Sequence, residues 1–314
     1  MLPDAPSLGM GTPRVVWSPS YEVDIGPHVF PTRKYRMVRE RLLSLGIVGE
    51  GDFVQPEPVG YEILARVHTP EYLRKIREDC FSPLERYELE VPFSRALELA
   101  ARTCCGGTLL AGRMALEDGV AVHLGGGFHH AFADHGEGFC LLNDVAVAAM
   151  TLLEEGAVSQ VLVVDLDVHQ GNGTAAIFGG DRRVCTVSIH QERNYPALKP
   201  TSDLDFGLPD GIGDEAYLAT LEATLDRALD RCTPQIAFYL AGADPYCEDQ
   251  LGGLGLTKEG LRERDAMVLR TLRTHGIAVA VTLAGGYAWK ECDTVEIHAA
   301  TVAAAVELFQ GAVP

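Results

Sequence analysis

The sequence lacks the features of a secreted or membrane-spanning protein. No uninterrupted apolar run approaches the ~20 residues that a membrane helix needs. The N-terminal segment MLPDAPSLGMGTPRV has no basic region followed by an apolar one, as a signal peptide would have. The eight cysteines include no CxxC pair, which disfavours a zinc knuckle or a disulfide scaffold. We therefore expect a cytoplasmic protein with reduced thiols and no membrane span.

Basic residues are also scarce. The chain has 26 Lys and Arg against 44 Asp and Glu, which gives a formal net charge of −18. Such a surface repels nucleic acid, so we expect no direct binding of DNA or RNA. It would tolerate a cationic substrate, such as a lysine-rich protein tail or a polyamine. The simpler interpretation is an acidic surface that keeps the protein in solution.

Sequences typical of linkers are missing as well. No Ser/Gly-rich tract, long charge run or internal repeat interrupts the 314 residues, and 47% of them are hydrophobic, which is enough for a large core. We predict one domain over residues 1–314, with residues 1–14 as a loose N-terminal extension. Nothing in the sequence predicts an oligomeric state.

Motifs for several other chemistries are absent. GNGT at 171–174 lacks the length and the lysine of a phosphate-binding loop, and GGGFHH lacks the spacing of a dinucleotide fingerprint. No GxSxG sequence is present, so a serine hydrolase of the α/β type is not supported.

Short apolar runs recur along the chain and predict buried strands. Each is rich in Val, Ile, Ala or Leu without polar alternation, as in a parallel sheet covered on both faces. Segments between them have helical periodicity, as in Asp144–Glu155 and Glu215–Arg231. Alternating strands and helices predict a doubly wound α/β architecture. The predicted strands are Val120–His123, Gln160–Val164, Val184–Ile189, Gln235–Leu240 and Ile277–Leu283.

Polar segments that contain glycine follow four of these strands. They are LGGGFHHAFADHGEGFCLLND after residue 123, DLDVHQGNGT after 164, AGADP after 240 and AGGYAW after 283. In parallel sheets, ligands bind outside the carboxyl ends of the strands. We therefore expect these four segments to form the ligand-binding edge.

The segment DLDVH predicts part of a metal site. Asp165, Asp167 and His169 occur at spacings of two, and in an extended segment such residues point the same way. Asp244, in a Gly-flanked turn after another strand, could supply a third ligand. Two carboxylates and one His leave room for water and a substrate carbonyl, as catalytic sites do. The alternative is that these aspartates only cap helices and form turns.

Two histidines and a tyrosine add candidate catalytic groups. His129 and His130 follow three glycines, which let the backbone approach a ligand closely. They could act as base and acid, or be a solvated pair in a loop. Tyr287 follows Gly285 and Gly286, and its phenol could donate to a developing oxyanion. Otherwise it is a packed aromatic with its hydroxyl at the surface.

Together these segments resemble the histone deacetylase family. GGGFHHA, GFC, DLDVHQGNGT, AGADP and GGY occur in this order, and the resemblance runs from about Trp17 to about Leu308. Gln170, NYP at Asn194–Pro196 and DQLGGLGLTKEGLRERD look like the class IV branch and its bacterial relatives. The resemblance implies the arginase/deacetylase fold, which has three αβα layers and a mostly parallel sheet. It also implies a zinc-dependent amidohydrolase that removes acyl groups from the ε-amine of lysine.

The resemblance also implies roles for individual residues. Asp167, His169 and Asp244 match the zinc ligands, although carboxylate-rich sites also accept iron(II). His130 matches the general base and His129 its electrostatic partner. Asp165 matches the carboxylate that orients His129, and Asn172 matches the position behind His130. Tyr287 matches the tyrosine that polarises the amide carbonyl.

Further matches concern the substrate tunnel and a structural potassium ion. Gly138 and Phe139 match one wall of an acyl-lysine tunnel, Tyr195 is expected to form the opposite wall, and Gly286 is expected to bind substrate. The potassium site would use Asp165, Asp167, His169, Ser188 and Ile189, with backbone oxygens from the last two.

The resemblance leaves the substrate open. One hypothesis is a protein or peptide lysine deacylase, and another is a deacylase of a small acylated amine such as an acetylpolyamine. A third is a non-catalytic binding module that keeps the fold. An arginase-like enzyme with two metals is disfavoured, because DLDVH and Asp244 supply ligands for one.

The chain departs from the family's patterns in two places, one from class I and one from class IV. Class I members have an acidic residue in a tyrosine-containing loop that binds the substrate backbone. Over Phe81–Ser94 no motif of this chain identifies such a residue, and Glu85, Glu88 or Glu90 could take its place. Glu248 stands where the class IV pattern has Gly, so we expect the turn before Asp249 to differ.

Overall fold

Eight parallel strands form one sheet at the centre of the structure, a computed structural model that describes residues 14–310. Their order is β2-β1-β3-β8-β7-β4-β5-β6. The sequence prediction of a mostly parallel sheet is confirmed, and every pairing between these strands is parallel. The strands are β1 (Val15–Val16), β2 (Phe53–Val54), β3 (Val120–His123), β4 (Val161–Asp165), β5 (Val184–Gln191), β6 (Leu204–Leu208), β7 (Ile236–Leu240) and β8 (Ala278–Thr282).

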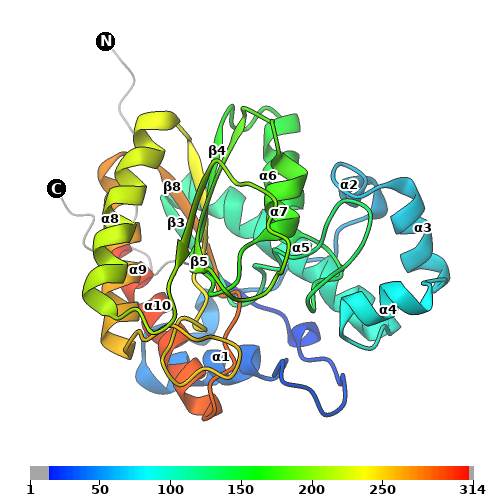
Figure 1. The fold of residues 1–314 in the computed structure, drawn as a ribbon, viewed down its shortest axis with the longest axis horizontal. Coiled ribbons are helices and arrows are strands. Elements are labelled where there is room, and N and C mark those ends of the chain that lie inside the picture. Colours follow the sequence, from blue (N-terminus) through cyan, green and yellow to red (C-terminus); the bar gives the residue numbers. More distant parts are fainter. Residues whose placement is uncertain (1–13, 311–314) are drawn as a thin grey trace.

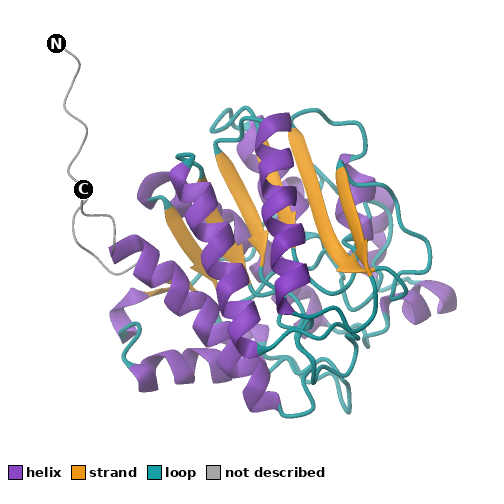
Figure 2. Ribbon diagram, turned by 60° about the vertical axis from the view of Figure 1, so that its left-hand side comes forward, coloured by secondary structure: helices purple, strands orange, loops and turns teal. Residues whose placement is uncertain are grey.

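Helices cover both faces of the sheet (Figures 1 and 2). Alternate residues of β4 enter different cores: Val161 and Val163 pack with one group of helices, and Leu162 and Val164 with the other. This confirms the three αβα layers. The first group contains α5 (Arg95–Asp118), α6 (Asp144–Glu154) and α7 (Asn172–Phe178), and the second contains α1 (Lys34–Leu45), α8 (Asp214–Arg231), α9 (Lys258–Thr274) and α10 (Glu291–Gln310).

A third apolar cluster lies beside α5. It joins the N-terminal segment to α2 (Tyr61–Leu64), α3 (Pro70–Glu78) and α4 (Pro83–Leu89), which extend to the right in Figure 1. The N-terminal part of the chain also contains two short 3-10 helices, Pro19–Tyr21 and Glu50–Asp52. Within residues 14–310, no helix combines the length and apolar character needed to cross a membrane.

The predicted strands are the five central ones, β3, β8, β7, β4 and β5, each within two residues of its predicted ends. The prediction missed β1, β2 and β6. The first two are only two residues long, and β6 is an edge strand whose middle residues are partly exposed. The predicted N-terminal extension lies outside the described residues except for Arg14, which pairs with Asp118.

A buried arginine on α9 ties two strand ends together. Arg264 Nη1 donates to the carbonyl of Gly242 (2.6 Å) and, more weakly, to that of Leu166 (3.4 Å), in the segments that follow β7 and β4. Its charge is balanced by Asp265, which also accepts from Tyr239 Oη at 2.6 Å. The two loops that carry Asp167 and Asp244 are therefore fixed to one another through α9.

We predict that Arg264→Met lowers the free energy of unfolding by about 3–5 kcal/mol, because it leaves the Asp265 carboxylate buried without its cation. Chemical denaturation measures the change. Arg262→Met is the control, because Arg262 lies exposed on the same helix in an ion pair with Glu259, and there we expect less than about 1 kcal/mol. Equal losses in the two variants would contradict the account.

Candidate metal centre and active site

The segment after β4 turns instead of continuing as a strand. Asp165 ends β4, and residues 167–169 form bends. Asp165 Oδ1 accepts from the Asp167 amide at 3.1 Å, and Asp167 Oδ1 accepts from the His169 amide at 3.0 Å. The expected extended geometry is therefore wrong. The aspartates hold the turns by capping backbone N–H groups two residues ahead.

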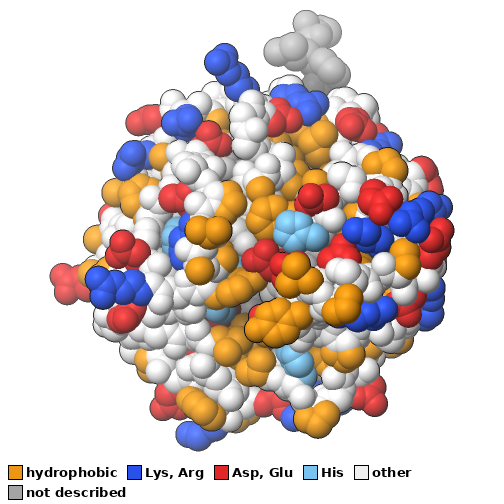
Figure 3. All heavy atoms as spheres, turned by 45° about the vertical axis from the view of Figure 1, so that its right-hand side comes forward, with side chains coloured by type: hydrophobic (Ala, Val, Ile, Leu, Met, Phe, Trp, Pro, Cys, Tyr) orange, Lys and Arg blue, Asp and Glu red, His pale blue; other side chains and the backbone are white. Residues whose placement is uncertain are grey.

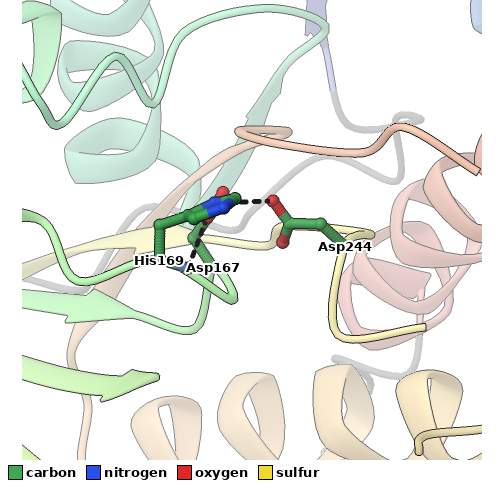
Figure 4. Close-up of side chains that lie close together, drawn as sticks. All are labelled: Asp167, His169 and Asp244. Carbon is green, nitrogen blue, oxygen red and sulfur yellow. Dashed lines mark hydrogen bonds and ion pairs between the residues drawn. The ribbon is translucent and has the colours of Figure 1, made fainter. Parts of the chain in front are cut away.

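Asp167, His169 and Asp244 meet at the carboxyl end of the sheet (Figure 4). One ligand atom from each lies within 4.8 Å of the other two, and all three residues are buried. His169 Nδ1 is 3.1 Å from Asp167 Oδ1 and 3.5 Å from Asp244 Oδ2. The structure thus brings together the three residues that the sequence suggested as metal ligands.

The donor set of this cluster fits a divalent cation. Asp244 Oδ1 accepts from the Val168 amide at 2.9 Å, but Asp244 Oδ2 is buried without a hydrogen bond from the described part of the chain. Such an oxygen is costly unless a cation or proton satisfies it. Two carboxylates and one imidazole with open positions are the ligands of catalytic zinc sites and suit iron(II) as well.

A glycine backbone closes the other side of the cluster. The Gly285 amide donates to Asp167 Oδ2 at 2.8 Å, and a Cβ at this position would overlap Asp244 Oδ2. Only glycine therefore allows the segment after β8 to approach both carboxylates.

His129 and His130 lie beside the cluster with an acceptor behind each ring. His129 Nδ1 is 2.6 Å from Asp165 Oδ2, and His130 Nδ1 is 2.6 Å from Asn172 Oδ1. The two Nε2 atoms are 3.1 Å apart. Asp144, at the start of α6, accepts from the amide preceding this pair at 2.8 Å and so fixes the glycine loop that carries it.

The two histidines have opposite charge preferences. Burial favours neutral imidazoles, but the carboxylates of Asp165 and Asp167 outweigh it at His129 and raise the pKa of His129 to about 9. Burial, together with the neighbouring His129 and His169, holds the pKa of His130 well below its usual range. At neutral pH His129 is therefore cationic, and His130 is neutral and able to accept a proton.

Tyr287 faces the same space from the segment after β8. Its amide donates to Asp249 Oδ2 at 2.7 Å, and Asp249 also caps the turn that follows it by accepting from Leu251. The ring packs edge-on against Phe139 at 6.1 Å. Burial raises the pKa of the Tyr287 phenol, so the hydroxyl stays protonated and able to donate.

A cavity of about 180 Å³ leads to these groups. The expected tunnel residues Gly138, Phe139 and Tyr195 all line it. Tyr195 packs edge-on against the His130 ring at 4.9 Å. On the face in Figure 3, apolar side chains border a hollow beside acidic and histidine side chains, the types that line this cavity. Gly286 does not reach this wall and instead faces Thr294 and His298, whereas Gly285 lines it.

Left-handed backbone shapes the tunnel wall. Gly138 and Phe139 have φ of 53° and 69°, inside a turn closed by hydrogen bonds between the backbones of Glu137 and Cys140. Phe139 is not a glycine, so this conformation is strained. The turn holds the Phe139 ring against the cavity.

The expected potassium residues lie on adjoining strands. Ser188 of β5 is paired in register with Asp165 of β4, and Ile189 follows it. Asp167 and His169 belong to the turn that leaves Asp165. The structure thus gathers the five residues at one end of the sheet, and potassium binding there stays a prediction.

The loop over Phe81–Ser94 contributes Glu90 to the cavity. Glu85 completes a capping box at the start of α4 and pairs with Lys75, so it serves the fold. Glu88 does not line the cavity, whereas Glu90 does. Glu90 has φ of 59°, and its carbonyl oxygen lies 2.9 Å from His28 Nε2.

Three residues near the site were missed by sequence reasoning. Glu137 accepts hydrogen bonds from Asn172 and Tyr195, and Asp249 supports Tyr287. Lys34 is fully buried, donates to the Ala284 carbonyl at 2.7 Å, and has a pKa that burial lowers to about 8. A lysine in the polar helix α1 gives no signal of this, since its position depends on tertiary packing.

The comparisons with known proteins agree with one another. Residues 28–303 match the model of the histone deacetylase domain. An uncharacterized protein of Picosynechococcus sp. is similar, with 40% identity over 96% of this chain and 100% of that protein. Histone deacetylase 2 of Arabidopsis thaliana is 29% identical over 87% of this chain and 74% of that protein.

A solved structure, the HD domain of HDA15, has a similar fold. The TM-score is 0.75 at 23% identity, over 95% of this chain and 91% of that one. This likeness confirms the predicted arginase/deacetylase fold.

We predict that zinc binding to the metal-free protein releases protons. Burial alone would lower the pKa of His169, but the carboxylates of Asp167 and Asp244 beside its Nδ1 raise it to about 10. The ion must displace this proton, so its apparent affinity should rise as pH increases from about 6 to about 8. Calorimetry in buffers of different ionisation enthalpy measures both the number of protons released and the zinc affinity. A His135→Ala control should behave like the wild type, and a pH-independent affinity would contradict the assignment of His169.

Proposed function

This chain belongs to the histone deacetylase family, and we propose that it is a zinc-dependent amidohydrolase that removes acyl groups from the ε-amine of lysine in a protein or peptide. One observation carries the proposal. Two members of a buried Asp-His-Asp cluster, Asp167 and His169, line one cavity together with two histidines that have acceptors behind them and a protonated tyrosine. A metal ion, a general base and an oxyanion donor around one cavity can together cleave an amide with water.

Asp167, His169 and Asp244 would hold the zinc ion, and iron(II) would suit the same ligands. When bound, the ion supplies Lewis-acid polarisation of the amide carbonyl and of the attacking water. Because Asp244 Oδ2 has no hydrogen bond from the described residues, it is free to serve as a ligand.

His130 would be the general base. Its Nδ1 faces the Asn172 carbonyl oxygen, which leaves Nε2 to take the proton of the attacking water. Burial, together with the cationic His129 that Asp165 holds, keeps His130 neutral before the reaction. The proton is then handed from His130 to the amide nitrogen as the carbon–nitrogen bond breaks, which releases a free amine and a carboxylate.

Tyr287 would donate its hydroxyl hydrogen to the oxyanion that forms at the carbonyl carbon. The hydrogen bond from its amide to Asp249 sets the backbone from which the side chain reaches the cavity. Phe139 and Tyr195 would flank the methylene stem of the acylated lysine, and Glu90 would meet the substrate backbone at the entrance.

A potassium ion would bind where β4 ends beside Ser188 and Ile189 of β5. The pairing of Ser188 with Asp165 supports this, because it places backbone oxygens of β5 beside the turn that carries Asp167 and His169. The class IV affinity and the cytoplasmic location stay predictions.

A panel of substrates tests the proposed activity. It comprises lysine peptides that carry acetyl to myristoyl groups, together with acetylated polyamines, each incubated with zinc-loaded protein. We expect turnover of acyl-lysine peptides in preference to the polyamines, measured as released amine. No turnover of any acylated amine would contradict the proposal, whereas a preference for polyamines would move the substrate class to small amines.

We predict that Tyr287→Phe lowers kcat by about 100–1,000-fold, since it removes one oxyanion donor. The unfolding temperature should change little, because the side-chain hydroxyl is not the group that bonds Asp249. Tyr87→Phe is a matched control, because Tyr87 is 78% exposed on α4. Comparable kcat values for the wild type and Tyr287→Phe would contradict the role of the hydroxyl.

A further inference from the structure

Glu137 makes a set of hydrogen bonds that reaches both the base and the tunnel wall. Its Oε1 accepts from Asn172 Nδ2 at 2.8 Å and from the Tyr195 hydroxyl at 2.5 Å. Its Oε2 is 3.5 Å from His135 Nε2. The backbone of Glu137 is fixed at the same time, because its amide and carbonyl both bond to Cys140. The carboxylate is therefore held in place between Asn172 and Tyr195.

His129 Nε2 lies 3.1 Å from His130 Nε2, and a hydrogen on His129 Nε2 favours a lone pair on that nitrogen of His130. Asn172 by itself adds no such preference at Nδ1. An amide offers an oxygen and an NH₂ group of nearly equal size, and either could face His130 Nδ1. If the NH₂ group faced it, Nδ1 would have to accept and the proton would sit on Nε2. His130 would then have no lone pair for the proton of water. An aspartate at this position would only accept, so it would leave no such choice.

The Glu137 carboxylate resolves this choice. An ionised carboxylate only accepts hydrogen bonds, so the group of Asn172 that faces Glu137 must be the NH₂ group. The amide oxygen then faces His130 Nδ1 at 2.6 Å, and Nδ1 must carry the hydrogen. Burial raises the pKa of Glu137, but hydrogen bonds from His135, Tyr195 and Asn172 outweigh it and lower the pKa overall, so the group is ionised at neutral pH.

We propose that Glu137 is a positioning residue that directs the Asn172 oxygen at His130 Nδ1 and so, together with His129 beside Nε2, holds the Nδ1–H tautomer of His130. Two residues, Asn172 and Glu137, thus provide the directed acceptor that one aspartate would supply. The shared hydrogen bond to Tyr195 ties the tunnel wall to the same carboxylate. The consequence for catalysis rests on the proposed function, in which His130 is the base. The tautomer itself is independent of that function.

The tautomer is observed directly by NMR of protein labelled with ¹⁵N-histidine. The His130 signals are identified by their loss in His130→Gln. In the wild type we expect a neutral ring protonated at Nδ1. In Glu137→Leu we expect the Nδ1 and Nε2 signals to move toward each other, as the Asn172 amide rotates and the tautomers mix. Glu137→Met, closer in length to glutamate, replaces the leucine variant if that fails to fold.

Kinetics test the consequence. Glu137→Leu should lower kcat by about 10–100-fold, the usual cost of losing a partner that orients a functional histidine, with a smaller change in KM. Glu137→Gln keeps an acceptor oxygen and should retain most of the activity. Adding Asn172→Asp to Glu137→Leu should restore kcat at least about tenfold, because aspartate accepts from His130 without help. Asp134→Asn, in the same loop without contact to Asn172, is the charge control.

The outcomes separate the two proposals. If Glu137→Leu leaves both the His130 tautomer and kcat as in the wild type, or if Asn172→Asp gives no recovery, the positioning role is overturned. If the wild type turns over no acylated amine but the tautomer shifts in Glu137→Leu, the proposed function fails and the positioning role stands.

Discussion

The burial of three aspartates at one end of a parallel sheet is the constraint on which the site depends. Asp165, Asp167 and Asp244 are each at most 3% exposed, and removing carboxylates from water costs several kcal/mol per ion unless each is hydrogen-bonded or paired. Backbone amides supply part of the compensation, from Asp167, His169, Val168 and Gly285. Cationic His129 supplies more, and buried Lys34 adds positive charge nearby. The one oxygen of these three carboxylates without a hydrogen bond from the described chain is Asp244 Oδ2, and a metal ion bound there would complete the balance.

The same constraint sets the protonation states of the histidines. The negative cluster holds His129 cationic, and the charge of His129 together with burial holds His130 neutral. Neutral His130 still needs its lone pair directed at the cavity, and the chain of acceptors through Asn172 to Glu137 provides that direction. Metal binding, base strength and tautomer are thus linked through contacts between loops that follow β3, β4 and β7.

Sequence reasoning recovered the parts of the fold and site whose determinants are local. The five central strands are buried on both faces and so appear as continuous apolar runs, whereas β6 is an edge strand without one. The residues of DLDVH were identifiable from their spacing, although the segment bends where an extended one was expected. Glu137, Lys34 and Arg264 were not identifiable, because each acts on residues between 22 and 250 positions away through tertiary packing. The orientation of the Asn172 amide is likewise set by a residue from another loop.

The central claim is that this site cleaves an amide by attack of water, with His130 taking the proton. The most direct measurement is hydrolysis of an acetyl-lysine peptide by zinc-loaded protein in ¹⁸O-labelled water, with mass analysis of both products. The account predicts one labelled oxygen in the released acetate and none in the peptide, with free amine formed in equal amount. Acetate without the label, or amine formed without acetate, would contradict it.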